Sequence, residues 1–224
     1  MNIQLIDNWN EIYQNDNIPP WEDLEHNSKF CEFIIQNSKQ DMQILELGAG
    51  LGHNAIFLAK AGLDVTASDI SENAMTRCKI LAQKNGVTLN CQTIDILNLS
   101  GSEGKFHLIY EKGCLHSFFD DSSRTRFAKS VASLLTKNGL WISACGSADN
   151  DDDPDDPQLS TYPRLSLLQI ALASEGCFEV KKIQKGFYGN RDCNQFLTWE
   201  CLFQKRANHA LHTDGNSAAL HCHR

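Results

Sequence analysis

The stretch QILELGAGLGHNAIFLAKAGLDVTASDIS, from Gln43 to Ser71, decides the fold of this chain. It is patterned as a short apolar strand, a glycine-rich turn over 48–52, a helix over 53–61 and a second strand that ends at Asp69. Glycines let the backbone approach a ligand closely, and the start of a helix presents free N–H groups. An acid about 20 residues beyond the first glycine of such a turn is placed to bind a ribose diol. The stretch therefore predicts a site for an adenosine-containing cofactor.

The spacing of the glycines indicates which cofactor this is. The dinucleotide fingerprint is G-x-G-x-x-G, whereas Gly48, Gly50 and Gly52 follow the spacing G-x-G-x-G. Glu46 stands two residues before the first glycine. The pattern E-x-G-x-G-x-G resembles motif I of the class I methyltransferases that use S-adenosylmethionine (SAM). The resemblance implies that the turn approaches the amino-acid part of SAM and that Asp69 holds the ribose; the alternative is a glycine-rich turn in an ordinary α/β protein.

Two further acids follow strands that we expect at 88–94 and 105–110. In class I methyltransferases an acid at the first of these ends commonly meets the adenine amino group, and the next residue packs on the ring. Asp95 and Ile96 match those positions, although Asp95 could also be a solvent-facing strand end. Glu111 ends the other strand. The cofactor residues that the resemblance implies are Trp21, Glu46, Gly48, Ala49, Gly50, Gly52, Asp69, Ile70, Asp95, Ile96 and Glu111.

The segment EKGCLHSF, residues 111–118, falls where this family places residues that contact the methyl acceptor. Enzymes that methylate amino groups of nucleic-acid bases usually carry an Asn/Asp-Pro-Pro-Tyr type motif here, and this segment lacks it. His116 is the candidate catalytic residue, because a histidine can relay a proton near neutral pH. The alternative is that His116 only makes a local hydrogen bond.

The N-terminal segment IPPWEDLEHNSKF carries a second signal. Trp21 follows the stiff Pro19-Pro20 pair, which restricts how the chain approaches it. The segment resembles the Pro-Trp-acid motif of the thiopurine S-methyltransferase-like group, which includes thiol and halide methyltransferases. The resemblance implies a lid over the SAM site, formed by about residues 1–40. Trp21 would then pack near the sulfonium, which favours an aromatic face, or would anchor an N-terminal helix to the core.

Strand and helix patterns alternate along the chain, which predicts a mainly parallel sheet covered by helices on both faces. Asn138-Gly139 is expected to end a helix that begins near Ser122. With the resemblance, the pattern predicts a Rossmann-like, three-layer α/β/α fold with an antiparallel last strand.

One domain is expected over 1–206, followed by a flexible tail over 207–224. The other expected helices are 71–85 and 166–175, and the other strands are 140–145, 178–187 and 196–203.

The composition argues against several classes of partner. The chain has 224 residues and a formal net charge of -8 without basic runs, so it is a poor candidate for binding nucleic acid or an anionic membrane surface. No apolar stretch is long enough to span a bilayer, and residues 1–17 do not form a signal peptide pattern. No two of the nine cysteines are separated by only two residues, and the acidic run at 149–156 has no EF-hand pattern, so no metal site is expected. We expect a cytoplasmic protein with reduced thiols; its oligomeric state is not indicated.

These observations predict a SAM-dependent methyltransferase that acts on a small molecule, with a thiol somewhat favoured. A thiolate needs little help from a general base, and His116 is the only candidate base. Oxygen and nitrogen acceptors stay open, because His116 could deprotonate them. The competing hypothesis is a non-catalytic SAM-binding sensor or a partner of another subunit, and turnover would separate the two.

Overall fold

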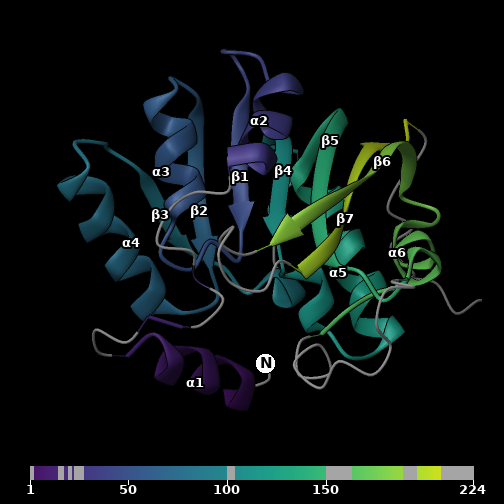
Figure 1. The fold of residues 1–224 in the computed structure, drawn as a ribbon, viewed down its shortest axis with the longest axis horizontal. Coiled ribbons are helices and arrows are strands. Elements are labelled where there is room, and N and C mark those ends of the chain that lie inside the picture. The colour runs from purple at the N-terminus through teal and green to yellow at the C-terminus, as the bar shows by residue number, and fades with distance from the viewer. Residues whose placement is uncertain are drawn as a thin grey trace, which may run out of the picture.

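A seven-stranded mixed sheet forms the centre of the molecule (Figure 1). The computed structural model describes residues 3–14, 18–19, 22, 28–99, 104–149, 163–188 and 196–207, and the strands counted here lie within them. The strands are β1 (Gln43–Leu47), β2 (Asp64–Asp69), β3 (Asn90–Thr93), β4 (Phe106–Lys112), β5 (Leu135–Gly146), β6 (Phe178–Tyr188) and β7 (Phe196–Lys205), in the sheet order β3-β2-β1-β4-β5-β7-β6. Strands β1 to β5 pair in parallel, whereas β7 is antiparallel to both β5 and β6. The expected fold, a mainly parallel sheet with an antiparallel last strand, is confirmed.

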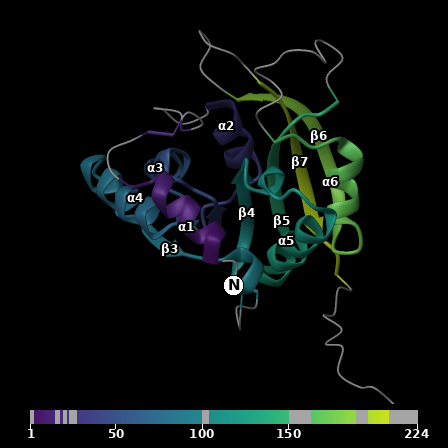
Figure 2. The same cartoon turned by 90° about the horizontal axis from the view of Figure 1, so that it is seen from below.

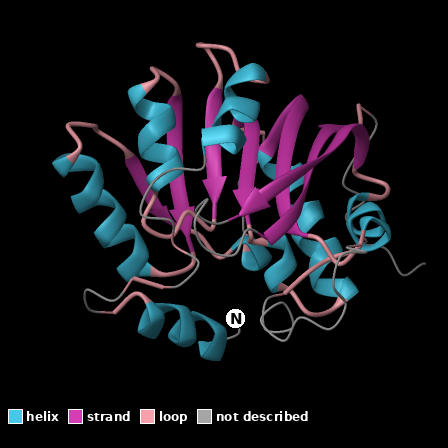
Figure 3. Ribbon diagram, in the orientation of Figure 1, coloured by secondary structure: helices cyan, strands magenta, loops and turns pink. Residues whose placement is uncertain are grey.

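Helices cover both faces of this sheet (Figure 3). One face carries α2 (Ser28–Gln36), α3 (His53–Lys60) and α4 (Glu72–Lys84), and the other carries α5 (Asp121–Leu134) and α6 (Leu167–Ser174). Short 3-10 helices follow β3 and β4, and these are η1 (Ile96–Asn98) and η2 (Leu115–Ser117). The N-terminal helix α1 (Ile3–Ile12) lies below the carboxyl edge of the sheet in Figure 1, and Figure 2, seen from below, shows it in front of the sheet beside α4.

Capping side chains start the helices where the sequence predicts them. Ser71 Oγ accepts a hydrogen bond from the Ala74 N–H at 3.1 Å and begins α4. Ser166 and Gln169 form a reciprocal capping box at the start of α6. Each such cap satisfies backbone donors that a helix start leaves open. The expected N-cap at Ser71 is confirmed.

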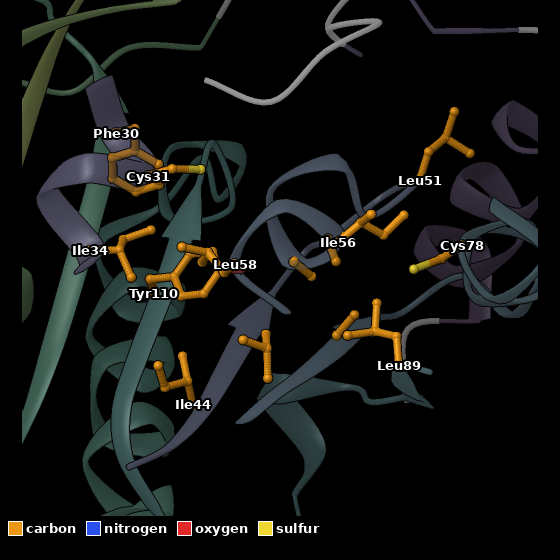
Figure 4. Close-up of a cluster of buried hydrophobic side chains, with 14 of the residues drawn as sticks. Phe30, Cys31, Ile34, Ile44, Leu51, Ile56, Leu58, Cys78, Leu89 and Tyr110 are labelled. Carbon is orange, nitrogen blue, oxygen red and sulfur yellow. The ribbon is translucent and has the colours of Figure 1, made fainter. Parts of the chain in front are cut away.

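Two hydrophobic layers hold the strands whose ends form the site. On the α2–α3 face, Phe30 lies edge-on to Tyr110 with ring centroids 6.2 Å apart, beside Leu58 (Figure 4). On the α5–α6 face, Trp141 stacks on Phe203 with ring centroids 4.7 Å apart. Burying each side chain of this size stabilises the fold by about 1.5–3 kcal/mol. The strand ends are therefore held on a rigid base.

The strand order reverses between β1 and β4, and this reversal locates the site. From β1 the chain proceeds through α3 to β2 on one side, whereas β4 lies on the other side and leads to α5. In open α/β sheets, ligands bind at the carboxyl ends of the strands beside such a reversal. The connections that follow β1, β2 and β4 meet there.

The end of α5 differs from the sequence prediction. The helix ends at Leu134 and β5 begins at Leu135, so Asn138-Gly139 lies inside the strand rather than at the end of the helix. Leu135 is fully buried, and the Lys105 N–H donates to the Leu134 carbonyl at 2.9 Å. Burial and pairing with the chain before β4 thus extend the strand, and Asn138 is accommodated at a φ of 62°.

Some predictions fall outside the described residues. These are the position of Trp21, most of the acidic run at 149–156 and nearly all of the tail over 207–224. The lid over about residues 1–40 is described only in part, and its division from the domain over 1–206 stays a prediction. In the part of the chain that is described, no helix is long and apolar enough to cross a membrane. A cytoplasmic location stays a prediction.

Candidate active site

The glycine turn after β1 adopts backbone angles that favour glycine. Gly48, Gly50 and Gly52 have φ values of 66°, 53° and 79°, in the left-handed region that other L-residues rarely adopt. The Ala49 N–H donates to the Ser68 carbonyl at 2.8 Å, which ties the turn to β2. A Cβ atom at Gly48 would lie 3.2 Å from the Cβ of Cys114, so the turn also packs against the segment after β4. The motif residues thus form a tight turn that leads into α3.

Asp69 joins this turn to the start of α4. Its Oδ2 accepts a hydrogen bond from the Gly50 N–H at 2.9 Å, and its Oδ1 accepts one from the Ser71 N–H at 3.0 Å. The side chain is buried, and this burial raises its pKa, while the two N–H donors oppose the shift. Ile70 lies between these residues and is half-buried. The structure therefore places the expected ribose acid directly against the glycine turn.

Two residues of the N-terminal segment also reach the turn. Glu22 Oε1 accepts hydrogen bonds from Tyr13 Oη at 2.8 Å and from the Leu51 N–H at 3.0 Å. A Cβ atom at Gly50 would lie 1.9 Å from that oxygen, so the carboxylate lies directly on this glycine. Neither Tyr13 nor Glu22 is among the site residues predicted from the sequence. The Pro-Trp-acid motif could have indicated Glu22, because it contains the acid as well as the tryptophan.

Glu46, the acid of motif I, points into the interior beside Tyr110. Burial raises the pKa of Glu46 to about 8, whereas Tyr110 and Asn54 act to lower it. Glu46 Oε2 and Tyr110 Oη each lack a hydrogen bond of normal geometry among the described residues, although the two groups lie near enough to affect each other's pKa. Glu46 thus carries a proton more readily than an exposed glutamate does.

Glu111 organises the turn after β4. Its Oε2 accepts hydrogen bonds from the Cys114 N–H at 2.7 Å and the Leu115 N–H at 3.1 Å, and its Oε1 accepts one from Ser143 Oγ on β5. The residue is fully buried, and this burial raises its pKa to about 7. Its carboxylate oxygens are therefore engaged by the protein itself, and they position η2.

His116 lies on η2 and faces the end of β5. Its Nδ1 accepts a hydrogen bond from the Gly146 N–H at 2.9 Å, and burial lowers its pKa to about 4. The ring is therefore neutral near pH 7, and the hydrogen bond at Nδ1 assigns its proton to Nε2. A neutral histidine in this tautomer donates a hydrogen bond from Nε2 and cannot accept a proton there. The geometry supports a hydrogen-bond donor in place of the expected base.

Asp95 and Ile96 follow β3 at the same edge of the sheet. Asp95 Oδ1 accepts a hydrogen bond from the Leu97 N–H at 3.0 Å, and its Oδ2 accepts one from Asn98 Nδ2 at 2.6 Å. Asp95 is half-buried and caps η1, whereas Ile96 is buried in the α5–α6 layer. Among the described residues, no group of three or more His, Cys, Asp or Glu side chains could hold a metal ion.

Part of the chain is similar to a known protein family. Residues 44–139, from β1 through the start of β5, match the family described as "Methyltransferase domain". An uncharacterized methyltransferase of Schizosaccharomyces pombe is 30% identical over 89 residues, which is 39% of this chain and 60% of that protein. The chain thus matches less than two thirds of the length of this curated relative.

Solved structures share the fold over nearly the whole chain. A protein studied for the conversion of a disulfide bond into a thioacetal group during echinomycin biosynthesis superimposes with a TM-score of 0.77 at 17% identity, covering 91% of this chain and 93% of that one. The 1,6-didemethyltoxoflavin-N1-methyltransferase of Burkholderia thailandensis, solved with its acceptor and S-adenosylhomocysteine (SAH), superimposes with a TM-score of 0.67 at 19% identity, covering 90% and 87%. The fold is the Rossmann-like methyltransferase fold. Residues 44–139 are thus similar to methyltransferase domains, and the whole chain has the fold of methyltransferases.

Proposed function

We propose that this protein is a SAM-dependent methyltransferase whose acceptor is a small molecule, with a thiol favoured. The observation that carries the proposal is the glycine turn, in which Gly50 is hydrogen-bonded to Asp69 at 2.9 Å within a methyltransferase domain. A turn of this kind with an acid beside it suits a nucleoside-containing ligand. SAM supplies an already activated methyl group, so the protein gains most by aligning the acceptor and excluding water.

The cofactor contacts form part of the proposal. Asp69 would hold the ribose hydroxyls, and Asp95 with Ile96 would meet the adenine. The glycine turn would approach the amino-acid part, and Trp21 would lie near the sulfonium. The other proposed members of the site are Glu46, Gly48, Ala49, Gly50, Gly52, Ile70 and Glu111, of which Glu111 would act through the turn that it holds.

The state of His116 favours an acceptor that needs no strong base. With Nδ1 engaged by Gly146 and a pKa near 4, His116 is suited to donate a hydrogen bond to the acceptor and not to remove its proton. A thiol has a pKa near 8.5 and ionises with little help, unlike an alcohol. A structural neighbour studied for disulfide-to-thioacetal conversion also concerns sulfur chemistry. These points support a thiol and fit the thiopurine S-methyltransferase-like resemblance.

Other acceptors are represented among the structural neighbours. The Burkholderia thailandensis enzyme is named an N1-methyltransferase, so this fold also serves nitrogen acceptors. The acidic chain, with a net charge of -8, argues against a nucleic-acid acceptor. We therefore keep a small molecule as the acceptor class and treat the thiol as the preferred member.

Turnover tests the proposal directly. The purified protein is incubated with SAM and a panel of small thiols, amines, hydroxyl compounds and halides, and SAH release is measured. We expect SAH with at least one thiol, at a rate above that with amines or alcohols. SAM binding without turnover on any acceptor would instead support the non-catalytic sensor, and failure to bind SAM would overturn both.

A further inference from the structure

The end of β4 places a lysine beside the glycine turn. Glu111 is paired in register with Leu47, the last residue of β1, so Lys112 follows beside the start of the turn. Alternate side chains of a strand share one face of the sheet, and Tyr110, two residues before Lys112, packs in the α2–α3 layer. Glu46 is in register with Tyr110 and lies on that face as well. The half-buried Lys112 is thus on the face that carries Glu46, one step nearer the carboxyl edge.

Three ionisable groups from different segments lie within the field of this lysine. Burial raises the pKa of Glu22, of Glu46 and of the Cys31 thiol on α2, and the positive charge of Lys112 opposes each of these shifts. The interaction of two charges falls with their separation, so the ammonium lies close to all three groups. Lys112 therefore lies where the N-terminal segment, α2 and the end of β1 meet.

The N–H groups of the glycine turn are already engaged within the protein. Without these partners they could bind an anion at the start of α3. The N–H groups of residues 49–52 donate, in order, to the Ser68 carbonyl at 2.8 Å, Asp69 Oδ2 at 2.9 Å, Glu22 Oε1 at 3.0 Å and the Ala49 carbonyl at 2.8 Å. An anionic group that approaches the turn consequently needs another donor.

SAM brings such an anionic group to the turn. Its amino-acid part, which faces the turn in our proposal, carries an ammonium and a carboxylate. Glu22 and Glu46 offer acceptor oxygens for the ammonium, but their negative charge repels the carboxylate. A lysine ammonium has three donors, and its charge-assisted hydrogen bonds to a carboxylate are stronger than those between neutral groups. Lys112 thus supplies the cation that the carboxylate requires.

We propose that Lys112 is a cofactor-binding residue whose ammonium binds the carboxylate of the amino-acid part of SAM. The acids beside it, Glu22 and Glu46, then face the ammonium of the same amino-acid part. Because SAH keeps both groups, Lys112 binds the methyl donor and the product alike. The inference rests on SAM as the cofactor and is independent of the acceptor.

Calorimetric titration of three ligands into the full chain tests this role. SAM and SAH carry the carboxylate, whereas decarboxylated SAM keeps the adenosine, the sulfonium and the amine but lacks it. Lys112→Met removes the charge and keeps most of the apolar stem. We expect this variant to bind SAM and SAH about 10- to 100-fold more weakly, as loss of a charged hydrogen-bond partner would. Its affinity for decarboxylated SAM should stay within about twofold of that of the unaltered chain, because that ligand has no group for Lys112 to bind.

Two further variants act as controls. Lys105→Met removes an exposed lysine directly before β4 and should leave all three affinities unchanged. Lys112→Arg keeps the charge and should keep most of the preference for SAM over decarboxylated SAM. The unaltered chain should itself bind SAM about tenfold or more tightly than decarboxylated SAM, which provides a test if Lys112→Met does not fold.

The ligand without the carboxylate separates direct binding from an effect on the neighbouring acids. If Lys112 acts only by neutralising Glu22 and Glu46, Lys112→Met should weaken SAM and decarboxylated SAM equally, and this result would overturn the inference. No loss for SAM in Lys112→Met, or equal affinity of the unaltered chain for both ligands, would overturn it as well. Failure of the unaltered chain to bind SAM would instead count against the methyltransferase proposal.

Discussion

Two parts of the carboxyl edge of the sheet, one after β1 and β2 and the other after β4 and β5, each use a buried carboxylate to organise backbone N–H groups. Asp69 binds the Gly50 N–H across the turn that we propose faces the cofactor. Glu111 binds the Cys114 N–H and Leu115 N–H in its own connection, and Ser143 on the neighbouring strand. The same chemical group thus holds the turn that we propose binds the cofactor after β1 and β2, and a turn of the protein scaffold after β4 and β5. The two carboxylates differ in role because the fold places different N–H and O–H donors around each of them.

Removing the scaffold carboxylate should have the largest effect. Glu111→Ala leaves Ser143 and two backbone N–H groups without their acceptor inside the core. We expect the free energy of unfolding, measured by urea denaturation, to fall by about 4 kcal/mol, from unsatisfied donors and the cavity together. Asp64→Ala, at the exposed start of β2, should change it by less than about 0.5 kcal/mol. A small loss in Glu111→Ala would contradict the scaffold role.

Glu111 and His116, which both follow β4, should affect the pH dependence of stability in opposite directions. The pKa of Glu111 is raised from 4.5 to about 7, so the folded protein binds this proton more tightly, and the contribution of Glu111 to stability falls as pH rises through that window. The pKa of His116 is lowered from 6.5 to about 4, so the folded protein binds that proton more weakly, and the contribution of His116 rises as pH increases between those values.

Conservative variants of the two residues test these opposite changes of the free energy of unfolding with pH. The contribution of Glu111 to the free energy of unfolding falls as pH rises from 4.5 to 7, and Glu111→Gln should abolish this fall. The contribution of His116 rises as pH increases from 4 to 6.5, and His116→Gln should abolish this rise. Each change is at most about 3.4 kcal/mol across its window. Urea denaturation at several pH values reports both. Slopes that change in the same direction in the two variants would refute the assignment.

Asp69→Ala tests the proposed cofactor site after β1 and β2. The variant removes the acceptor of the Gly50 N–H and Ser71 N–H and the proposed ribose ligand, so we expect SAM affinity to fall by about 1–3 kcal/mol. Calorimetric titration gives the affinity, and Asp64→Ala at the other end of β2 is the matched control. Unchanged affinity in a folded Asp69→Ala protein would remove Asp69 from the proposed site.

Substitution of His116 should give the smallest effect, and this effect should be confined to kcat. If Nε2 donates a hydrogen bond to the acceptor, His116→Gln should lower kcat about five- to tenfold while SAM affinity stays within about twofold. The dependence of kcat on pH should keep its shape in the variant, because a donor does not change its protonation near neutral pH. Loss of a kinetic step near pH 4 on substitution would show that His116 acts as a base.

Local patterns explain why much of the fold could be predicted. The glycine turn, the N-cap at Ser71 and the alternation of strands and helices depend on residues near one another in the chain, and the structure confirms them. The expected helix end at Asn138-Gly139 was wrong, because the burial of Leu135 and its pairing with Phe106 override the local signal. The contact of Glu22 with Leu51 joins residues 29 positions apart and was missed.

The sequence by itself determined that a glycine turn and an acid lie at the ends of adjacent strands, since these elements follow one another directly in the chain. Only the tertiary structure decided what the other polar groups do. The Gly146 N–H assigns the proton of His116 to Nε2, and the donors around Glu111 make it part of the scaffold. Protonation and hydrogen bonding depend on burial and on partners brought together by folding, and residue type alone does not specify either.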